Sequence, residues 1–138
     1  MNILFLCVAN SARSQMAEGL AKSMLGQGHN IQSAGSIPSG EVHPNAVIAM
    51  DEIGIDIRDQ FSKSTDDLDK EFIDNLDYAI TLCAEEVCPV LPSKAQNLHW
   101  MNEDPANQAF NEIQLKTSFR NTRENLYKLI KKFMIENT

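Results

Sequence analysis

The sequence has few features of a secreted, membrane-bound or nucleic-acid-binding protein. No apolar run approaches the roughly 20 residues that a membrane-spanning helix needs, and the N-terminus lacks the basic segment and long apolar region of a secretory signal. Lys and Arg number 12 against 19 Asp and Glu, a formal net charge of −7, so no basic stripe is available to bind nucleic acid. We therefore expect a cytoplasmic protein that binds neither membranes nor nucleic acid.

Cysteine is also scarce. The chain has three cysteines, an odd number that does not suit a framework of structural disulfides, and in a reducing compartment such cysteines are catalytic or redox-active. With 138 residues, 43% hydrophobic and 22% charged, the chain is large enough to bury a core without disulfides. We predict a single domain over residues 1–138.

The stretch from Ile3 to Ser14 predicts a buried strand, a loop and the start of a helix, with the Cys7 thiol at the end of the strand. Backbone N–H groups of such a loop can converge on an anion together with the first N–H groups of the helix. Arg13 adds a fork of donors for a tetrahedral oxyanion, and the same positive field favours the thiolate of Cys7. A lone cysteine is more often a small buried apolar residue, but this combination favours an anion-binding nucleophile. The predicted oxyanion-binding residues are Val8, Ala9, Asn10, Ser11, Ala12 and Arg13.

Residues 7–14, the Cys7 loop, resemble the Cys-x5-Arg-Ser signature of the low-molecular-weight protein tyrosine phosphatases and of the thioredoxin-coupled arsenate reductases built on the same fold. The match continues through Glu18 and, with the distal features below, covers nearly the whole chain. Ala9 stands where the family often has glycine. The resemblance implies an α/β fold, a three-layer sandwich around a four-stranded parallel sheet, and an arsenate- or phosphate-type oxyanion as the substrate.

Asp104, followed by Pro105, matches the general acid of this family, which would protonate the oxygen that leaves as Cys7 attacks. Without the resemblance, an Asp-Pro pair is usually only a turn. Ser14, by the same resemblance, hydrogen-bonds the Cys7 sulfur. Its ordinary role at this position is a helix N-cap, and the two roles are compatible.

The remaining pattern predicts alternating helices and strands, with a loop over 35–44 that could overhang the active site. The strand predicted at 77–82 ends at Cys83 as the first strand ends at Cys7, so both thiols are expected at the carboxyl edge of one parallel sheet. Apolar spacing predicts helices over 14–26, 44–54, 64–76 and about 109–134, the last with Ile113 and Phe133 facing inward, and strands over 31–34 and 97–100.

Cys83 and Cys88 are open to three interpretations. They could bind zinc with a histidine, although a second pair of ligands is missing, or they could be buried structural thiols. The resemblance implies a third role, a redox relay: Cys7 attacks arsenate, Cys83 forms a disulfide with Cys7, and Cys88 resolves it for thioredoxin or glutaredoxin. Residues five apart in a regular helix have Cα atoms roughly 8 to 9 Å apart, beyond the ~7 Å limit of a disulfide, so the 83–88 segment must rearrange.

Other functions of this fold stay open at this point. The main alternative is a protein tyrosine phosphatase that acts through a phosphocysteine at Cys7, and the other is a non-catalytic oxyanion-binding or redox-sensing module. Phosphatases of the family usually have an aromatic residue after the Asp-Pro pair, whereas this chain has Ala106, which offers no stacking face.

We assign no metal and no cofactor. The resemblance implies that some relatives hold a structural cation, with residues that match Asn10, Glu18, Ser33 and Asp66, but oxygen ligands alone specify an ion poorly. The same residues can equally support the loop and the helix. None of the motifs includes His29, His43 or His99, and we expect these histidines to be structural or surface residues.

Overall fold

The protein is built on a parallel sheet of four strands in the order β2-β1-β3-β4. We describe it from a computed structural model, in which residues 1–84 and 94–137 are described. The crossovers from β1 to β2 and from β2 to β3 pass through helices, as the alternating pattern predicted, and the parallel α/β fold is confirmed. The strands are β1 (Asn2–Cys7), β2 (Asn30–Gly35), β3 (Tyr78–Thr81) and β4 (Gln96–His99).

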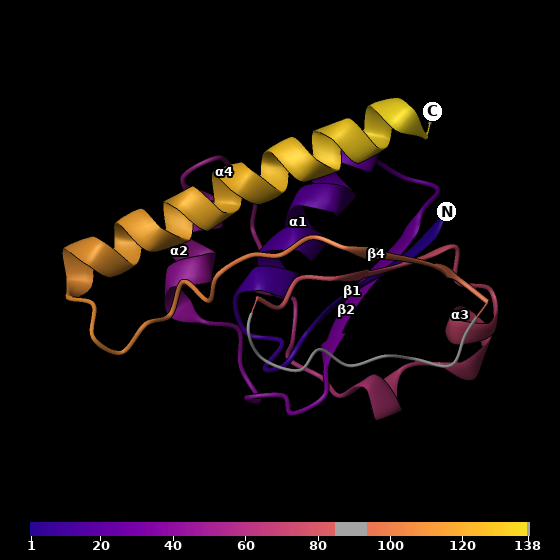
Figure 1. The fold of residues 1–138 in the computed structure, drawn as a ribbon, viewed down its shortest axis with the longest axis horizontal. Coiled ribbons are helices and arrows are strands. Elements are labelled where there is room, and N and C mark those ends of the chain that lie inside the picture. The colour runs from indigo at the N-terminus through magenta and orange to yellow at the C-terminus, as the bar shows by residue number, and fades with distance from the viewer. Residues whose placement is uncertain (85–93, 138) are drawn as a thin grey trace.

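Helices cover both faces of the sheet (Figure 1). On one face pack α1 (Arg13–Leu25), α2 (Pro44–Asp51) and the long α4 (Glu112–Glu136). On the other face lies the short α3 (Lys70–Asp74). Among the helices of the described residues, none is long and apolar enough to span a membrane.

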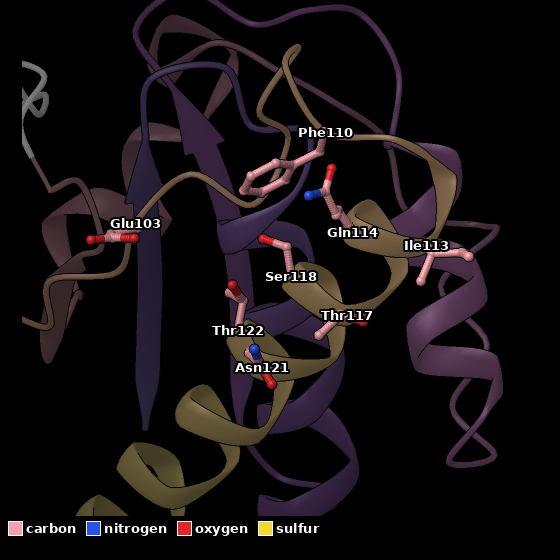
Figure 2. Close-up of a pocket in the computed structure, with 8 residues that line it drawn as sticks. All are labelled: Glu103, Phe110, Ile113, Gln114, Thr117, Ser118, Asn121 and Thr122. Carbon is pink, nitrogen blue, oxygen red and sulfur yellow. The ribbon is translucent and has the colours of Figure 1, made fainter.

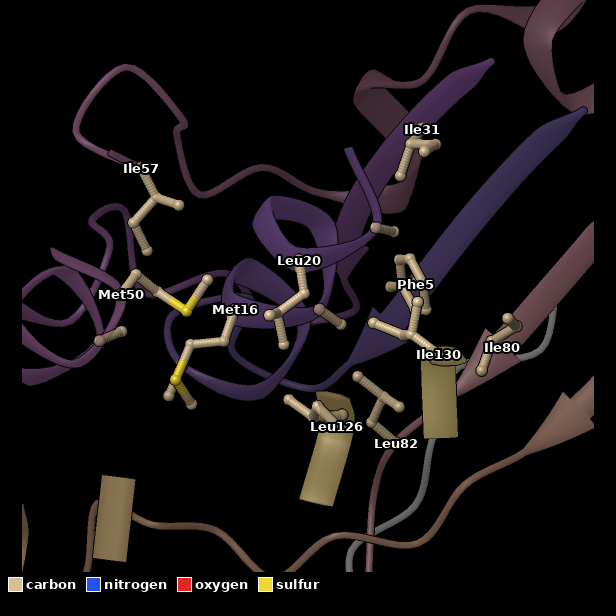
Figure 3. Close-up of a cluster of buried hydrophobic side chains, with 14 of the residues drawn as sticks. Phe5, Met16, Leu20, Ile31, Met50, Ile57, Ile80, Leu82, Leu126 and Ile130 are labelled. Atoms are coloured by element: carbon tan, nitrogen blue, oxygen red, sulfur yellow. The ribbon is translucent and has the colours of Figure 1, made fainter. Parts of the chain in front are cut away.

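The pleat of β1 divides the core between these two layers. Ile3 and Phe5 join the larger cluster with α1 and α4, in which Figure 3 labels Phe5, whereas Leu4 and Leu6 join the smaller cluster with α3. All four are 1% exposed or less, because a strand that is covered on both faces is apolar at every position. Because β1 is buried on both faces, its position in the sheet is fixed. The point at which Cys7 leaves the sheet is therefore fixed as well.

The single helix predicted over 64–76 is wrong. Ser64 does cap a helical turn, with its side chain accepting from Asp66 N–H at 3.1 Å, but that turn is only a 3-10 helix over Thr65–Asp67. The chain then becomes extended at Leu68, with ψ of 139°, and buries that side chain in the smaller cluster. Burial of Leu68 therefore breaks the helix before α3 begins.

The last helix begins later than the pattern predicted. Asn111 and Gln114 form a reciprocal capping box, with Gln114 N–H donating to Asn111 at 2.8 Å, so α4 starts at Glu112 rather than near Ala109. Ile113 is 77% exposed, contrary to its predicted inward position, whereas Phe119, Leu126 and Phe133 are buried as predicted.

An ion-pair cluster joins α2 to α4 on the surface. Glu52, at the end of α2, accepts hydrogen bonds from Arg120 Nε and Arg123 Nη1, both at 2.9 Å, and Arg123 also donates to the carbonyl of Ala49 at 2.7 Å. The hydrogen bond from Arg120 is the main reason that the pKa of Glu52 falls to about 2 from its ordinary 4.5. The cluster thus favours the charged form of Glu52 in the folded state.

We expect this cluster to contribute stability only where Glu52 is ionised in the fold. Because its pKa is lowered on folding, the contribution is complete above pH ~4.5 and is lost as the pH falls toward ~2. Urea unfolding of the wild type and of Glu52→Gln between pH 2 and pH 6 measures it: the difference in the free energy of unfolding should be largest at pH 6 and should shrink with added salt. A difference that grows at low pH would contradict the assignment.

Candidate active site

The Cys7 loop connects β1 to α1. Neighbouring segments of the chain hold it by donating hydrogen bonds to its carbonyl groups. The carbonyls of Val8 and Ala9 accept from the backbone N–H groups of Ile37 and Ser39 at 3.0 and 2.9 Å. The Ser11 carbonyl accepts from His43 N–H at 2.8 Å. These three donors lie in the loop over 36–43, which therefore packs along the Cys7 loop, in the region where the sequence predicted an overhanging loop.

The remaining loop carbonyls are also bonded. Asn10 O accepts from Gln15 Nε2 at 3.0 Å, and Ala12 O accepts from Met16 N–H at 2.9 Å within the first turn of α1. In a trans peptide the N–H points away from the preceding carbonyl, so the N–H groups of residues 9–13 face the side opposite these donors. At Ala12, α1 begins without a side-chain cap, which leaves the helix start open to an anion. The arrangement can bind a tetrahedral oxyanion in front of Cys7.

Asn10 is the centre of a buried hydrogen-bond network. Its φ of 47° lies in the left-handed region, which asparagine tolerates better than most residues, and it is fully buried. The amide oxygen accepts from Lys63 N–H at 2.9 Å and from Gln15 Nε2 at 3.0 Å. The backbone donor of Lys63 fixes the orientation of the amide, so its nitrogen faces Ser14 and Ser33.

The network extends to the nucleophile. Asn10 Nδ2 donates to Ser14 Oγ at 2.8 Å, and Ser14 Oγ lies 2.8 Å from Cys7 Sγ, where its hydroxyl can donate to a thiolate. Cys7 is a free thiol and 2% exposed. Ser14 lies inside the first turn of α1 and is not its N-cap, so the simple capping role is wrong. Its hydroxyl can stabilise a thiolate at Cys7.

Gly35, at the end of β2, makes room for the loop. A Cβ atom built on Gly35 would overlap the carbonyl oxygen of Val8 and lie 3.0 Å from the backbone nitrogen of Asn10. Only glycine lets the two backbones approach this closely. The sequence pattern read Gly35 as the start of a loop and gave no sign of this contact.

Arg13 is held by the loop that follows β4. It is 4% exposed, and its Nη1 donates to the carbonyl of Asn102 at 3.1 Å. Asn102 is itself fixed, because its N–H donates to Leu82 O at 3.0 Å and its Oδ1 accepts from Asn125 in α4 at 2.7 Å. Asn102 is a positioning residue that sequence reasoning missed, since no local pattern distinguishes it.

Asp104 follows Asn102 on the same loop, so the structure brings the predicted acid to the side of the site that also holds Arg13. Its Oδ1 accepts from Ala106 N–H at 3.0 Å, which makes the turn expected of an Asp-Pro pair. The carboxylate is exposed, whereas Pro105 is buried. A turn and a general acid are therefore compatible at this position.

Ala106 packs against the larger core cluster and presents no aromatic face. The aromatic residue of this loop is Phe110, which lines a pocket of about 420 Å³ between the loop and the start of α4. Figure 2 shows its ring pointing into the space in front of Gln114 and Ser118, with Glu103 across from them. The sequence analysis did not single out Phe110.

The structure places Cys83 at the same sheet edge as Cys7. Leu82 N–H donates to Leu6 O at 2.9 Å and Leu6 pairs with Thr81, so Cys83 lies one residue beyond the position that is level with Cys7 on the neighbouring strand. Cys83 is 1% exposed. The other predicted redox residue, Cys88, lies outside the described residues.

Of the four residues that match a cation site, Asn10, Ser33 and Glu18 lie together and are hydrogen-bonded to one another. Asp66 is exposed on the 3-10 turn, and Asn10 turns its amide nitrogen, a donor, toward Ser33 at 3.0 Å. Ser33 in turn donates to Glu18 at 2.6 Å. A group of three or more His, Cys, Asp or Glu side chains that could hold a metal is absent from residues 1–84 and 94–137.

A lysine lies beside this network instead. Lys63 is 9% exposed, and its Nζ sits 4.6 Å from the centre of the Phe61 ring. Burial lowers the pKa of Lys63, and the carboxylate of Glu18 opposes that shift. Glu18 also pairs with Lys22 at 2.6 Å, so ammonium groups supply the positive charge that a metal ion would bring.

Comparison with known proteins gives a consistent result. The sequence model of the low molecular weight phosphotyrosine protein phosphatase family matches residues 2–137. A protein of Halalkalibacterium halodurans named arsenate reductase is 45% identical over 133 residues, which cover 95% of this chain and 93% of that protein.

Solved structures of similar fold include proteins described as arsenate reductases. One described as an arsenate reductase in the phosphate binding state is 33% identical, with a TM-score of 0.79, and the match covers 99% of this chain and 98% of that one. A thioredoxin-dependent arsenate reductase of Corynebacterium glutamicum is 29% identical, with a TM-score of 0.69, over 98% of this chain and 62% of its own.

We predict that Gly35→Ala disables the site more than the fold. The added methyl group displaces the Val8 carbonyl, and a shift of about 1 Å in such a loop costs on the order of 100-fold in turnover, against about 1 to 3 kcal/mol of stability. Steady-state kinetics and urea unfolding separate the two effects. The control is Gly26→Ala, where φ is 76° but no atom lies within 4 Å. It should lose about 1 kcal/mol and keep its activity; equal losses of activity in both variants would contradict the close contact.

We also predict that potassium does not stabilise this protein specifically. Lys63 and Lys22 already neutralise Glu18, and Asn10 presents its amide nitrogen, which is not a ligand of K⁺, toward Ser33. Thermal unfolding in equal concentrations of KCl and NaCl should give the same Tm. A rise of several degrees in KCl alone would show that a cation site forms after all.

Proposed function

The chain belongs to the low molecular weight phosphotyrosine protein phosphatase family, and within it we propose that this protein is an arsenate reductase whose three cysteines form a redox relay with thioredoxin as the reductant. The curated relative of 45% identity bears the name arsenate reductase. The resemblance to the thioredoxin-coupled arsenate reductases implies the relay and its reductant, and the thioredoxin-dependent arsenate reductase of Corynebacterium glutamicum supports them. We further propose that residues 1–138 act as one domain in the cytoplasm.

The observation that carries the proposal is the pairing of an anion cradle with a second cysteine, Cys83, which is disulfide-bonded in this structure. The Cys7 loop directs the N–H groups of residues 9–13 to one side and holds Ser14 Oγ 2.8 Å from Cys7 Sγ. Cys83 follows the neighbouring strand, one residue beyond the position that is level with Cys7. A phosphatase needs only the first of these features, whereas a reductase needs both.

The first step forms a bond between Cys7 and arsenic. The Cys7 thiolate attacks arsenate held by the loop and Arg13, and one arsenate hydroxyl group leaves as water after it takes the proton that Asp104 supplies. Arsenic is still pentavalent in this adduct. Asn102 holds Arg13, so the guanidinium meets the anion in a fixed orientation.

The second step is the reduction. The Cys83 thiolate attacks Cys7 Sγ, the sulfur–arsenic bond breaks, and its electron pair stays on arsenic, which leaves as arsenite. The product is a disulfide between Cys7 and Cys83. Cys88 then attacks Cys83, which frees the Cys7 thiolate and gives a Cys83–Cys88 disulfide for the thioredoxin dithiol to reduce. Glutaredoxin is the alternative reductant.

Phosphate ester hydrolysis is the second candidate, because the Cys7 loop, Arg13 and Asp104 suffice for a phosphocysteine and its hydrolysis by water. Ala106 argues against an aromatic substrate, since it packs into the core and offers no ring to stack on. We therefore place reduction first and expect at most slow hydrolysis.

Cysteine variants test the relay. We expect Cys7→Ser to abolish every activity, because an alcohol is far less ionised than a thiol. Cys83→Ser should abolish arsenate turnover but keep slow aryl phosphate hydrolysis. Cys88→Ser should complete one turnover and then accumulate the disulfide between Cys7 and Cys83.

The measurements are thioredoxin-coupled turnover and peptide mass spectrometry of alkylated protein after one equivalent of arsenate, with glutaredoxin in a parallel assay. Full arsenate turnover in either Cys83→Ser or Cys88→Ser would refute the relay of three cysteines. Turnover with glutaredoxin but not with thioredoxin would change only the reductant.

A further inference from the structure

Asn102 makes hydrogen bonds with all four of its polar groups. Its backbone carbonyl accepts from Arg13 Nη1 at 3.1 Å, and its backbone N–H donates to Leu82 O at 3.0 Å. Its side-chain Nδ2 donates to Trp100 O at 2.9 Å, and its Oδ1 accepts from Asn125 Nδ2 at 2.7 Å. Asn102, which is 5% exposed, therefore joins the end of the sheet, the start of α1 and the middle of α4.

The bond to Trp100 determines which way the amide of Asn102 points. A backbone carbonyl can only accept, so the amide nitrogen of Asn102 faces Trp100 and the amide oxygen faces Asn125. Asn125 is then the donor in the bond between the two amides. The side chain of Asn102 is thus held at one end by the sheet and at the other end by α4.

α4 is a rigid support for this bond. Leu126, the residue after Asn125, is fully buried and packs with Phe119 and Ile130 in the larger core cluster. Asn125 itself is exposed, and asparagine is a weak helix former that a solvent-facing helical position does not favour. Helix propensity therefore does not account for an asparagine here, whereas the bond to Asn102 gives it a task.

The group that orients Arg13 carries no net charge. The Asn102 carbonyl fixes the guanidinium through a hydrogen bond of 3.1 Å and adds no negative charge that would compete with a bound anion. A guanidinium binds a tetrahedral oxyanion through N–H groups that lie in one plane. A change in the orientation of Asn102 therefore changes the direction in which the N–H groups of Arg13 point.

We propose that Asn125 is a positioning residue for the oxyanion: through Asn102, it fixes the orientation in which Arg13 meets arsenate. The proposal rests on the proposed function, in which Arg13 holds the substrate anion. It gives a residue on the surface of α4 a part in substrate binding, although no sequence pattern distinguishes that residue.

Isothermal titration with inorganic phosphate, a tetrahedral oxyanion like arsenate, tests the proposal without turnover. Loss of one hydrogen bond between neutral groups is expected to weaken phosphate binding about two- to tenfold in Asn125→Ala. The Tm should change little, because the position is exposed and alanine is the better helix former. Unchanged phosphate affinity in Asn125→Ala would overturn the proposal.

Asn121 provides the matched control. It is the same residue type, is also exposed, and lies one turn before Asn125 in α4. Asn121→Ala should keep the phosphate affinity of the wild type. Equal losses of affinity in Asn121→Ala and Asn125→Ala would refute a specific role for the bond to Asn102.

A double variant tests whether Asn125 acts through Asn102. Asn102→Ala removes the side-chain bonds to Trp100 and Asn125 but keeps the backbone carbonyl that accepts from Arg13. Without the Asn102 side chain, Asn125→Ala should cause no further loss, so the double variant should bind phosphate as Asn102→Ala does. Losses that multiply in the double variant would contradict the proposed path.

Steady-state kinetics with arsenate separate positioning from a general loss of structure. Arg13 holds the anion both before and during the attack, and Asn125→Ala leaves Cys7 and Asp104 in place. We therefore expect KM for arsenate to rise by the same factor as the Kd for phosphate, with kcat nearly unchanged. A lower kcat with an unchanged KM would contradict the proposal. If the wild-type protein does not turn over arsenate at all, the proposed function fails, and the phosphate titration still decides whether Asn125 positions Arg13.

Discussion

The shape of the Cys7 loop depends on one constraint: its carbonyl groups must all find donors on the outer side of the loop. A loop of this kind has no ladder or helix of its own to satisfy them, and a buried carbonyl without a partner is costly. The donors come from the 36–43 loop, from Gln15 and from the first turn of α1. With every carbonyl bonded outward, the opposed N–H groups are gathered on the inner side, and the loop is prepared for an anion before one arrives.

The buried polar groups behind the loop extend this constraint. Asn10 links the nucleophile, through Ser14, to Glu18, through Ser33, in one chain of hydrogen bonds. A buried carboxylate such as Glu18 would be expensive without a counter-charge, and Lys22 and Lys63 supply it from two directions. In such a chain each bond polarises the next, so the charges near Glu18 and the hydrogen bond to Cys7 belong to one electrostatic unit.

The opposite wall of the site is assembled from distant parts of the chain. Asn102 connects Arg13 to the end of β3 and to Asn125 in α4, while His43 connects the Cys7 loop to α4 through Phe119. The long helix α4 contributes no nucleophile, base or acid, yet it contacts both residues that hold the catalytic loops. The face of α4 toward the sheet thus serves positioning as well as the core.

Local sequence patterns determined those parts of the protein whose structure depends on residues that are close together in the chain. The strand, Cys7, the loop and the helix at its start follow from a short apolar run, small residues and an arginine at fixed spacing, and Gly26 ends α1 where the pattern placed it.

Only the tertiary structure decided the rest. Leu68 breaks a helix because a second core cluster receives it, and Ile113 is exposed because the capping box starts α4 beyond the sheet. Asn10, Gly35, Lys63 and Asn102 gain their roles from partners between 4 and 89 positions away in the chain. Periodicity reports which face of an element is apolar, whereas contacts of this kind depend on how the elements pack, and packing is a property of the whole fold.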